Sequence, residues 1–108
     1  MPSDDRDIGR ARMEMQGILR DINRETIHDL VPNVSATELT PFFKLVARAR
    51  GMYIKRLIEL AQGTDDLPSD EKVRELNLLR RSYDELVHGA QMIETAIERG
   101  YIDVEKIS

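Results

Sequence analysis

Residues 70–99 read DEKVRELNLLRRSYDELVHGAQMIETAIER and contain the most regular hydrophobic pattern of the chain. The apolar residues recur at alternating steps of three and four, which is the spacing of a helix that packs along one seam. These residues are Leu76, Leu79, Tyr83, Leu86, Ala90, Ile93 and Ile97. Ser69 precedes the stretch as an N-cap, and Gly100 follows it as a stop signal. We therefore predict a long helix over residues 70–99.

A second amphipathic stretch lies near the start of the chain. Its apolar residues, again three and four apart, are Ile8, Ala11, Met15, Ile18 and Ile22. Asp4, Asp5 and Asp7 lie where negative charge stabilises a helix N-terminus, and Pro32 ends the segment. This pattern predicts a helix over about residues 5–30.

The middle of the chain has two competing helix starts. Ser35 and Glu38 have the spacing of a capping box, whereas Thr40 followed by Pro41 is typical of a cap with proline at the first helical position. A proline six residues into a helix would kink it, so we predict a short turn at 36–39 and a helix over about 41–62. The expected buried stripe is Phe42, Leu45, Val46, Ala49, Tyr53, Leu57 and Leu60.

These three segments predict an all-α protein with one helical domain spanning residues 1–108. Apolar residues nowhere alternate over a strand-length window, so strands are not expected. Short connections make neighbouring helices antiparallel, which gives an up-down-up bundle of three helices. After Gly100, the residues Tyr101, Ile102, Val104 and Ile107 are expected to fold back as a short tail.

The helix over 70–99 has more apolar surface than its main seam needs. At 1.5 Å per residue it would be about 45 Å long, against about 33 Å for the helix over 41–62, and would overhang it. The additional apolar residues off the seam are Leu78, Val87, Met92 and Ala96. Two interpretations follow: a well-buried central helix, or a homodimer formed through this surface.

The amino-acid composition excludes several kinds of functional site. The 108 residues carry 16 basic and 20 acidic side chains, a net charge of −4, and no cysteine. Disulfides, thiolate metal sites and cysteine nucleophiles are thereby excluded. No segment has the length of a signal peptide's apolar region or of a membrane span, and we expect a cytoplasmic protein. No nucleophile with an adjacent base or glycine-rich phosphate loop is present, so neither an enzyme nor a required cofactor is expected.

Both histidines follow a glutamate by three residues. Glu25 with His28 and Glu85 with His88 form two Glu-x-x-His pairs, which are half of the ligand set of ferritin-like di-iron bundles. Glu25 continues the apolar stripe of its helix, but His88 points about 200° away from Leu86. Ordinary surface histidines beside carboxylates explain both pairs as well, and we predict that the pairs do not converge within one chain.

The helix over 41–62 is the only basic one. Lys44, Arg48 and Lys55 share a stripe that is suited to phosphates or to an acidic protein surface. The turns do not have the short connection of a helix-turn-helix, and Tyr53 belongs to the predicted core. A solvated basic face is therefore the preferred interpretation, and nucleic-acid binding is not expected.

The leading functional hypothesis is a helical protein-protein interaction module, an adaptor or regulator that presents a helix face and forms a homodimer. It rests on the excess apolar surface and on the absence of catalytic motifs. Two alternatives belong to other classes. One is a ferritin-like metal-binding assembly, and the other is a binder of nucleic acid or an acidic partner through the basic helix.

Overall fold

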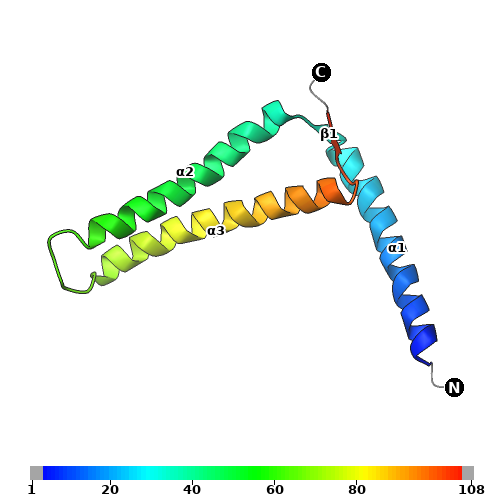
Figure 1. Ribbon diagram of the computed structural model, residues 1–108, viewed down its shortest axis with the longest axis horizontal. Helices are drawn as coiled ribbons and strands as arrows, with labels where there is room; N and C mark the ends of the chain where they lie inside the picture. The colour runs from blue at the N-terminus through cyan, green and yellow to red at the C-terminus, as the bar shows by residue number, and fades with distance from the viewer. Residues whose placement is uncertain (1–3, 106–108) are drawn as a thin grey trace. The chain divides into compact units, whose positions relative to one another are not determined.

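The computed structural model describes residues 4–105, and its main elements are three helices (Figure 1). Helix α1 spans Asp5–Leu30, α2 spans Ala36–Leu60 and α3 spans Asp70–Glu98. The prediction of an all-α protein is confirmed. The described chain divides into two compact units, one holding the residues before Ala36 and after Glu94, the other holding Ala36–Glu94. Helix α3 continues from the second unit into the first without a break.

Helix α1 begins and ends where the sequence signals place it. The Asp4 carboxylate accepts a hydrogen bond of 2.8 Å from the backbone N–H of Asp7, which satisfies one of the free N–H groups of the first turn. At the other end, the N–H of Val31 donates to the carbonyl of Ile27, just before Pro32. The predicted range of 5–30 is confirmed.

Helix α2 begins five residues earlier than predicted. The prediction of a start at Pro41 was wrong, because the helix starts at Ala36 and contains Pro41 in its second turn. A proline there removes only the backbone bond to the carbonyl of Thr37 near the start of the helix, and it costs less than it would in the helix interior. The Thr40 hydroxyl donates to the carbonyl of Ala36 at 2.7 Å in the same turn.

The early start of α2 also reduces the predicted overhang. The two helices have 25 and 29 residues, a much smaller difference than the predicted ranges gave. The expectation that α3 extends far beyond its neighbour was therefore wrong, and the overhang no longer argues for a dimer.

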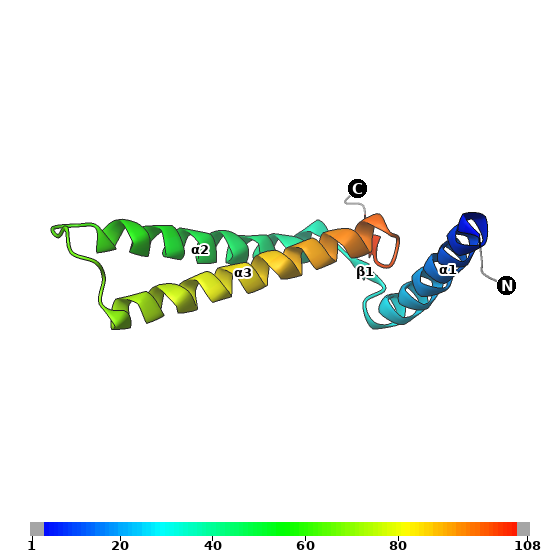
Figure 2. The same ribbon diagram turned by 90° about the horizontal axis from the view of Figure 1, so that it is seen from below.

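Helices α2 and α3 lie side by side in opposite directions in both views (Figures 1 and 2). Their connection, residues 61–69, contains Gly63 at φ 76°, a left-handed conformation that suits glycine. It ends with Ser69, whose hydroxyl accepts a hydrogen bond from the N–H of Lys72. Two contacts give the register: Arg56 with Glu75, and the Phe42 ring beside Gly89. Fourteen residues separate both the two α2 residues and the two α3 residues. The equal separation agrees with two helices that run side by side in opposite directions.

The seam between the two helices follows the heptad pattern on both sides. The α3 residues predicted for the seam are all half-buried. On α2 the half-buried residues are Leu39, Phe42, Val46, Ala49, Tyr53, Arg56 and Leu60. Leu45 and Leu57, which the sequence pattern placed in the seam, are 51% and 43% exposed and lie beside it.

The most buried residues of the described chain belong to the other unit. Val34, Ala96, Tyr101 and Ile102 are between 6 and 9% exposed. The N–H groups of Tyr101 and Ile102 both donate to the carbonyl of Ala96, and Gly100 makes the turn with φ 75°. Tyr101 and Ile102 thus turn back onto the end of α3, whereas Val104 is 47% exposed and Ile107 lies outside the described residues.

Two very short strands complete this unit. Strand β1 (Asn33–Val34) pairs in parallel with β2 (Asp103–Val104). The expectation of no strands was wrong in this detail, because two-residue strands are too short to show an alternating pattern. The pairing joins the connection after α1 to the segment after α3 and buries Val34.

Candidate interaction surface

The apolar stripe of α1 is exposed along its whole length. No residue of α1 is buried, and Ile8, Met15, Ile18 and Ile22 are 49 to 61% exposed. Together with Ala11 these residues form what we call the α1 stripe. A helix in a folded protein gains most of its stability when it packs its apolar face against another element. The α1 stripe is therefore an unfilled contact surface within its own unit.

Helix α2 has a second apolar face beside its seam with α3. Phe43, Ala47, Arg50, Ile54 and Leu57 recur at steps of four and three, and we call them the second face of α2. All five are exposed, and the three large apolar residues among them are 43 to 50% exposed. The helix thus uses one heptad seam for α3 and presents another to its surroundings.

The four predicted interface residues of α3 do not form one surface. Leu78 and Met92 are 62% and 60% exposed and lie on the same side of α3, fourteen residues apart. Val87 is half-buried and lies about 180° around the helix from Leu78. Ala96 is only 8% exposed, and it belongs to the small core formed with the tail.

The Glu-x-x-His pairs belong to different units. Glu25 and His28 lie on α1, Glu85 and His88 lie on α3, and all four are exposed. Within residues 4–105, no group of three or more histidine, aspartate, glutamate or cysteine side chains is placed to hold a metal ion.

His28 has a different partner from the one the sequence suggested. Its Nε2 atom lies 3.2 Å from Oδ2 of Asp103 on β2, and both side chains are largely exposed. An exposed pair of this kind contributes at most about 1 kcal/mol. His28 and Asp103 are 75 residues apart in the sequence, which explains why no local motif predicts their contact.

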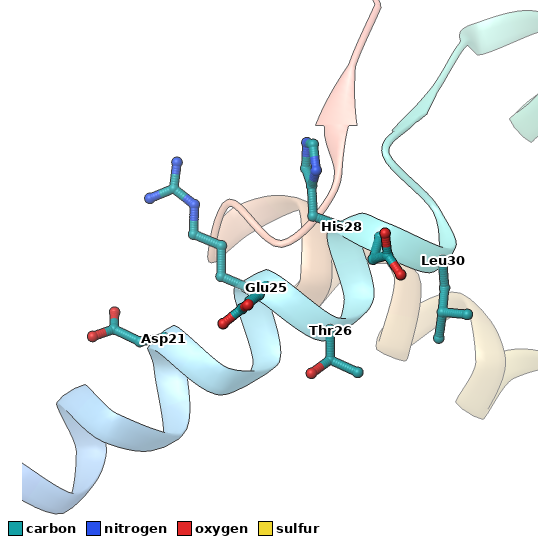
Figure 3. A pocket seen from close by; sticks show the side chains of 7 residues that line it. Asp21, Glu25, Thr26, His28 and Leu30 are labelled. Atoms are coloured by element: carbon teal, nitrogen blue, oxygen red, sulfur yellow. The ribbon is translucent and has the colours of Figure 1, made fainter.

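A shallow hollow lies beside the last turns of α1 (Figure 3). In this view His28 is directed toward β2, Thr26 and Leu30 lie on the opposite side of the helix, and Asp21 and Glu25 project to a third side. All of the lining residues come from α1. This hollow has no convergent polar groups of the kind that orient a small ligand.

The basic stripe of α2 is present as predicted on the exposed side of the helix. Lys44, Arg48 and Lys55 are all exposed, and Lys55 lies 3.9 Å from Glu59. Arg56 is the basic residue with the most defined surroundings, because its guanidinium contacts Glu75 at 2.8 Å and Glu59 at 3.4 Å. Arg56 was not among the residues predicted for the seam, although its spacing from Tyr53 and Leu60 places it there.

No described helix is long and apolar enough to cross a membrane. No family model, curated protein or solved structure matches this chain.

Proposed function

We propose that this chain is a helical protein-protein interaction module that works as a homodimer by burying exposed helix faces. The observation that carries the proposal is α1, a helix of 26 residues with a continuous apolar stripe and no buried side chain. Full burial of one large aliphatic side chain is worth about 1.5 to 3 kcal/mol. The α1 stripe has four such side chains, each 49 to 61% exposed, and covering them favours association.

The antiparallel up-down-up arrangement of three helices is part of the same proposal. The α2–α3 hairpin leaves the second face of α2 exposed, and a third helix packed there completes the bundle. The third helix can come from the same chain or from a second copy. In either case, α1 is the amphipathic helix that we propose packs against the second face of α2.

A substitution within the α1 stripe tests the proposal. Ile18→Glu places a charge in the middle of the stripe, and burying an unpaired carboxylate is strongly unfavourable. We expect multi-angle light scattering to show a dimer for the unmodified chain and mostly single chains for Ile18→Glu.

Met13→Glu is the matched control, because Met13 is 73% exposed and lies on the opposite side of α1 from the stripe. This variant should remain dimeric. Equal behaviour of the two variants would refute the role of the α1 stripe in association.

A further inference from the structure

The seam between α2 and α3 contains a positive charge. Among the described residues of the two helices, Arg56 is the one charged residue that is half-buried, and it occupies the seam position between Tyr53 and Leu60. Its side chain is 29% exposed. The guanidinium lies 2.8 Å from a carboxylate oxygen of Glu75 on α3, and 3.4 Å from one of Glu59 on α2 itself. Arg56 therefore has one partner across the seam and one on its own helix.

A half-buried charge in an apolar seam contributes little to stability. Removing a guanidinium from water is unfavourable, and replacing such an ion pair by apolar residues of similar volume is often neutral or stabilising. The best-attested role of a polar residue in a helical seam is to fix the register of the helices, because other alignments leave it without its partner. The position of Arg56 is thus better explained by specificity than by stability.

The apolar residues of the hairpin allow a second alignment. Both seams repeat every seven residues, so a shift of α2 by one heptad toward the end of α3 again brings apolar residues together. Val46 is nearly level with Leu86 in the observed register and would become nearly level with Ile93. Tyr53 would likewise move from the level of Leu79 to that of Leu86. The apolar pattern therefore does not select one register.

Arg56 distinguishes the two alignments. In the observed register it contacts Glu75, whereas the shift by one heptad places it level with Ser82, which has no charge. Glu75 would then lie about 10 Å away along the helix axis, beyond the reach of an ion pair. The half-buried guanidinium would lose this contact across the seam and keep Glu59 on its own helix.

We infer that Arg56, through its contact with Glu75, determines the register of the α2–α3 hairpin. Arg56 is a positioning residue, and its effect is on the alignment of the helices and not on their stability. The alignment decides which residues of α3 flank the second face of α2, so it also defines the surface that the hairpin presents. The inference concerns the hairpin within one chain and does not depend on the proposed homodimer.

The distance between two spin labels measures the register. The natural sequence has no cysteine, so Lys44→Cys and Lys72→Cys introduce two unique labelling sites, both at exposed positions. In the observed register these sites are offset by about 22 Å along the helix axis, and the shift by one heptad lengthens the offset by about 10 Å. Double electron–electron resonance is measured on labelled chains diluted with unlabelled protein, so that only distances within one chain contribute.

We expect one distance in the labelled chain, and a second, longer distance when Arg56→Leu is added. The urea midpoint of Arg56→Leu should be no lower than that of the unmodified chain. Glu75→Ala changes an exposed residue, and it should also give the second distance with unchanged helix content by circular dichroism. Lys55→Leu is the matched control, because it removes a neighbouring cation whose side chain is 78% exposed, outside the seam. The control should keep one distance.

A single unchanged distance in both Arg56→Leu and Glu75→Ala would overturn the inference. A lower urea midpoint with a single distance would show that the ion pair only stabilises the hairpin, which also overturns it. A second distance in Lys55→Leu would do the same, because loss of any cation on α2 would then suffice.

Discussion

Gly89 shows how closely α2 and α3 approach each other. A Cβ atom at this position would lie 3.6 Å from Cζ of Phe42, an ordinary van der Waals contact. Glycine in a helix interior costs up to about 1 kcal/mol relative to alanine. The methyl group of an alanine at position 89 therefore fits beside Phe42, and the alanine avoids the cost of glycine in the helix.

We expect Gly89→Ala to raise the free energy of unfolding by about 0.5 to 1 kcal/mol, measured by urea denaturation. Gly63→Ala is the matched control, because Gly63 has φ 76° and alanine there is strained. The control should lower the free energy of unfolding. Destabilisation by Gly89→Ala would mean that the hairpin is packed more tightly at Phe42 than the structure has it.

Individual capping and stop residues are the part of the fold that the sequence predicts best. Asp4, Ser69 and Gly100 lie at the helix ends where they were predicted, because each depends on a local backbone geometry. The sequence did not predict the contact partners of Arg56 and His28. Their contacts to Glu75 and Asp103 depend on the register between elements distant in sequence, which no local pattern encodes.

At the scale of the helices, the heptad pattern predicts a seam only where one face is apolar. Helix α3 has one such dominant face, and its predicted seam is half-buried throughout. Helix α2 has apolar residues on adjacent faces, so its pattern allowed Leu45 and Leu57 to be grouped with the seam. The start of α2 was misplaced for a related reason, since two valid signals, at Ser35 and at Thr40, compete within six residues.

Val87 and Met92 distinguish the two sides of the hairpin. The hairpin register places Val87 level with Phe43, beside the second face of α2, whereas Met92 lies on the side of α3 that includes Leu78. If α1 of a second copy binds the second face, Val87→Glu should shift the dimer toward single chains and Met92→Glu should not.

Sedimentation velocity at several concentrations measures how far each of the two variants dissociates into single chains. Circular dichroism of both variants controls for loss of helix, since both substitutions replace an apolar residue by glutamate. Dissociation by Met92→Glu alone would assign the interface to Leu78 and Met92, two of the four residues predicted from the sequence.

At the scale of the whole molecule, the sequence predicts the helix class but not the partners of the helices. The hydrophobic periodicity shows that α1, α2 and α3 each have a face to bury, and it contains no information on whether the covering helix belongs to the same chain. The small core of Val34, Ala96, Tyr101 and Ile102 was only partly anticipated. It depends on a two-residue strand pair that periodicity does not detect.

The central claim is that the exposed α1 stripe and the second face of α2 are buried by association of two chains. The most direct test is the molar mass of the unmodified 108-residue protein by light scattering at micromolar concentration. We predict twice the mass of one chain, with dissociation only on strong dilution. A mass of one chain at every concentration tested would contradict the claim.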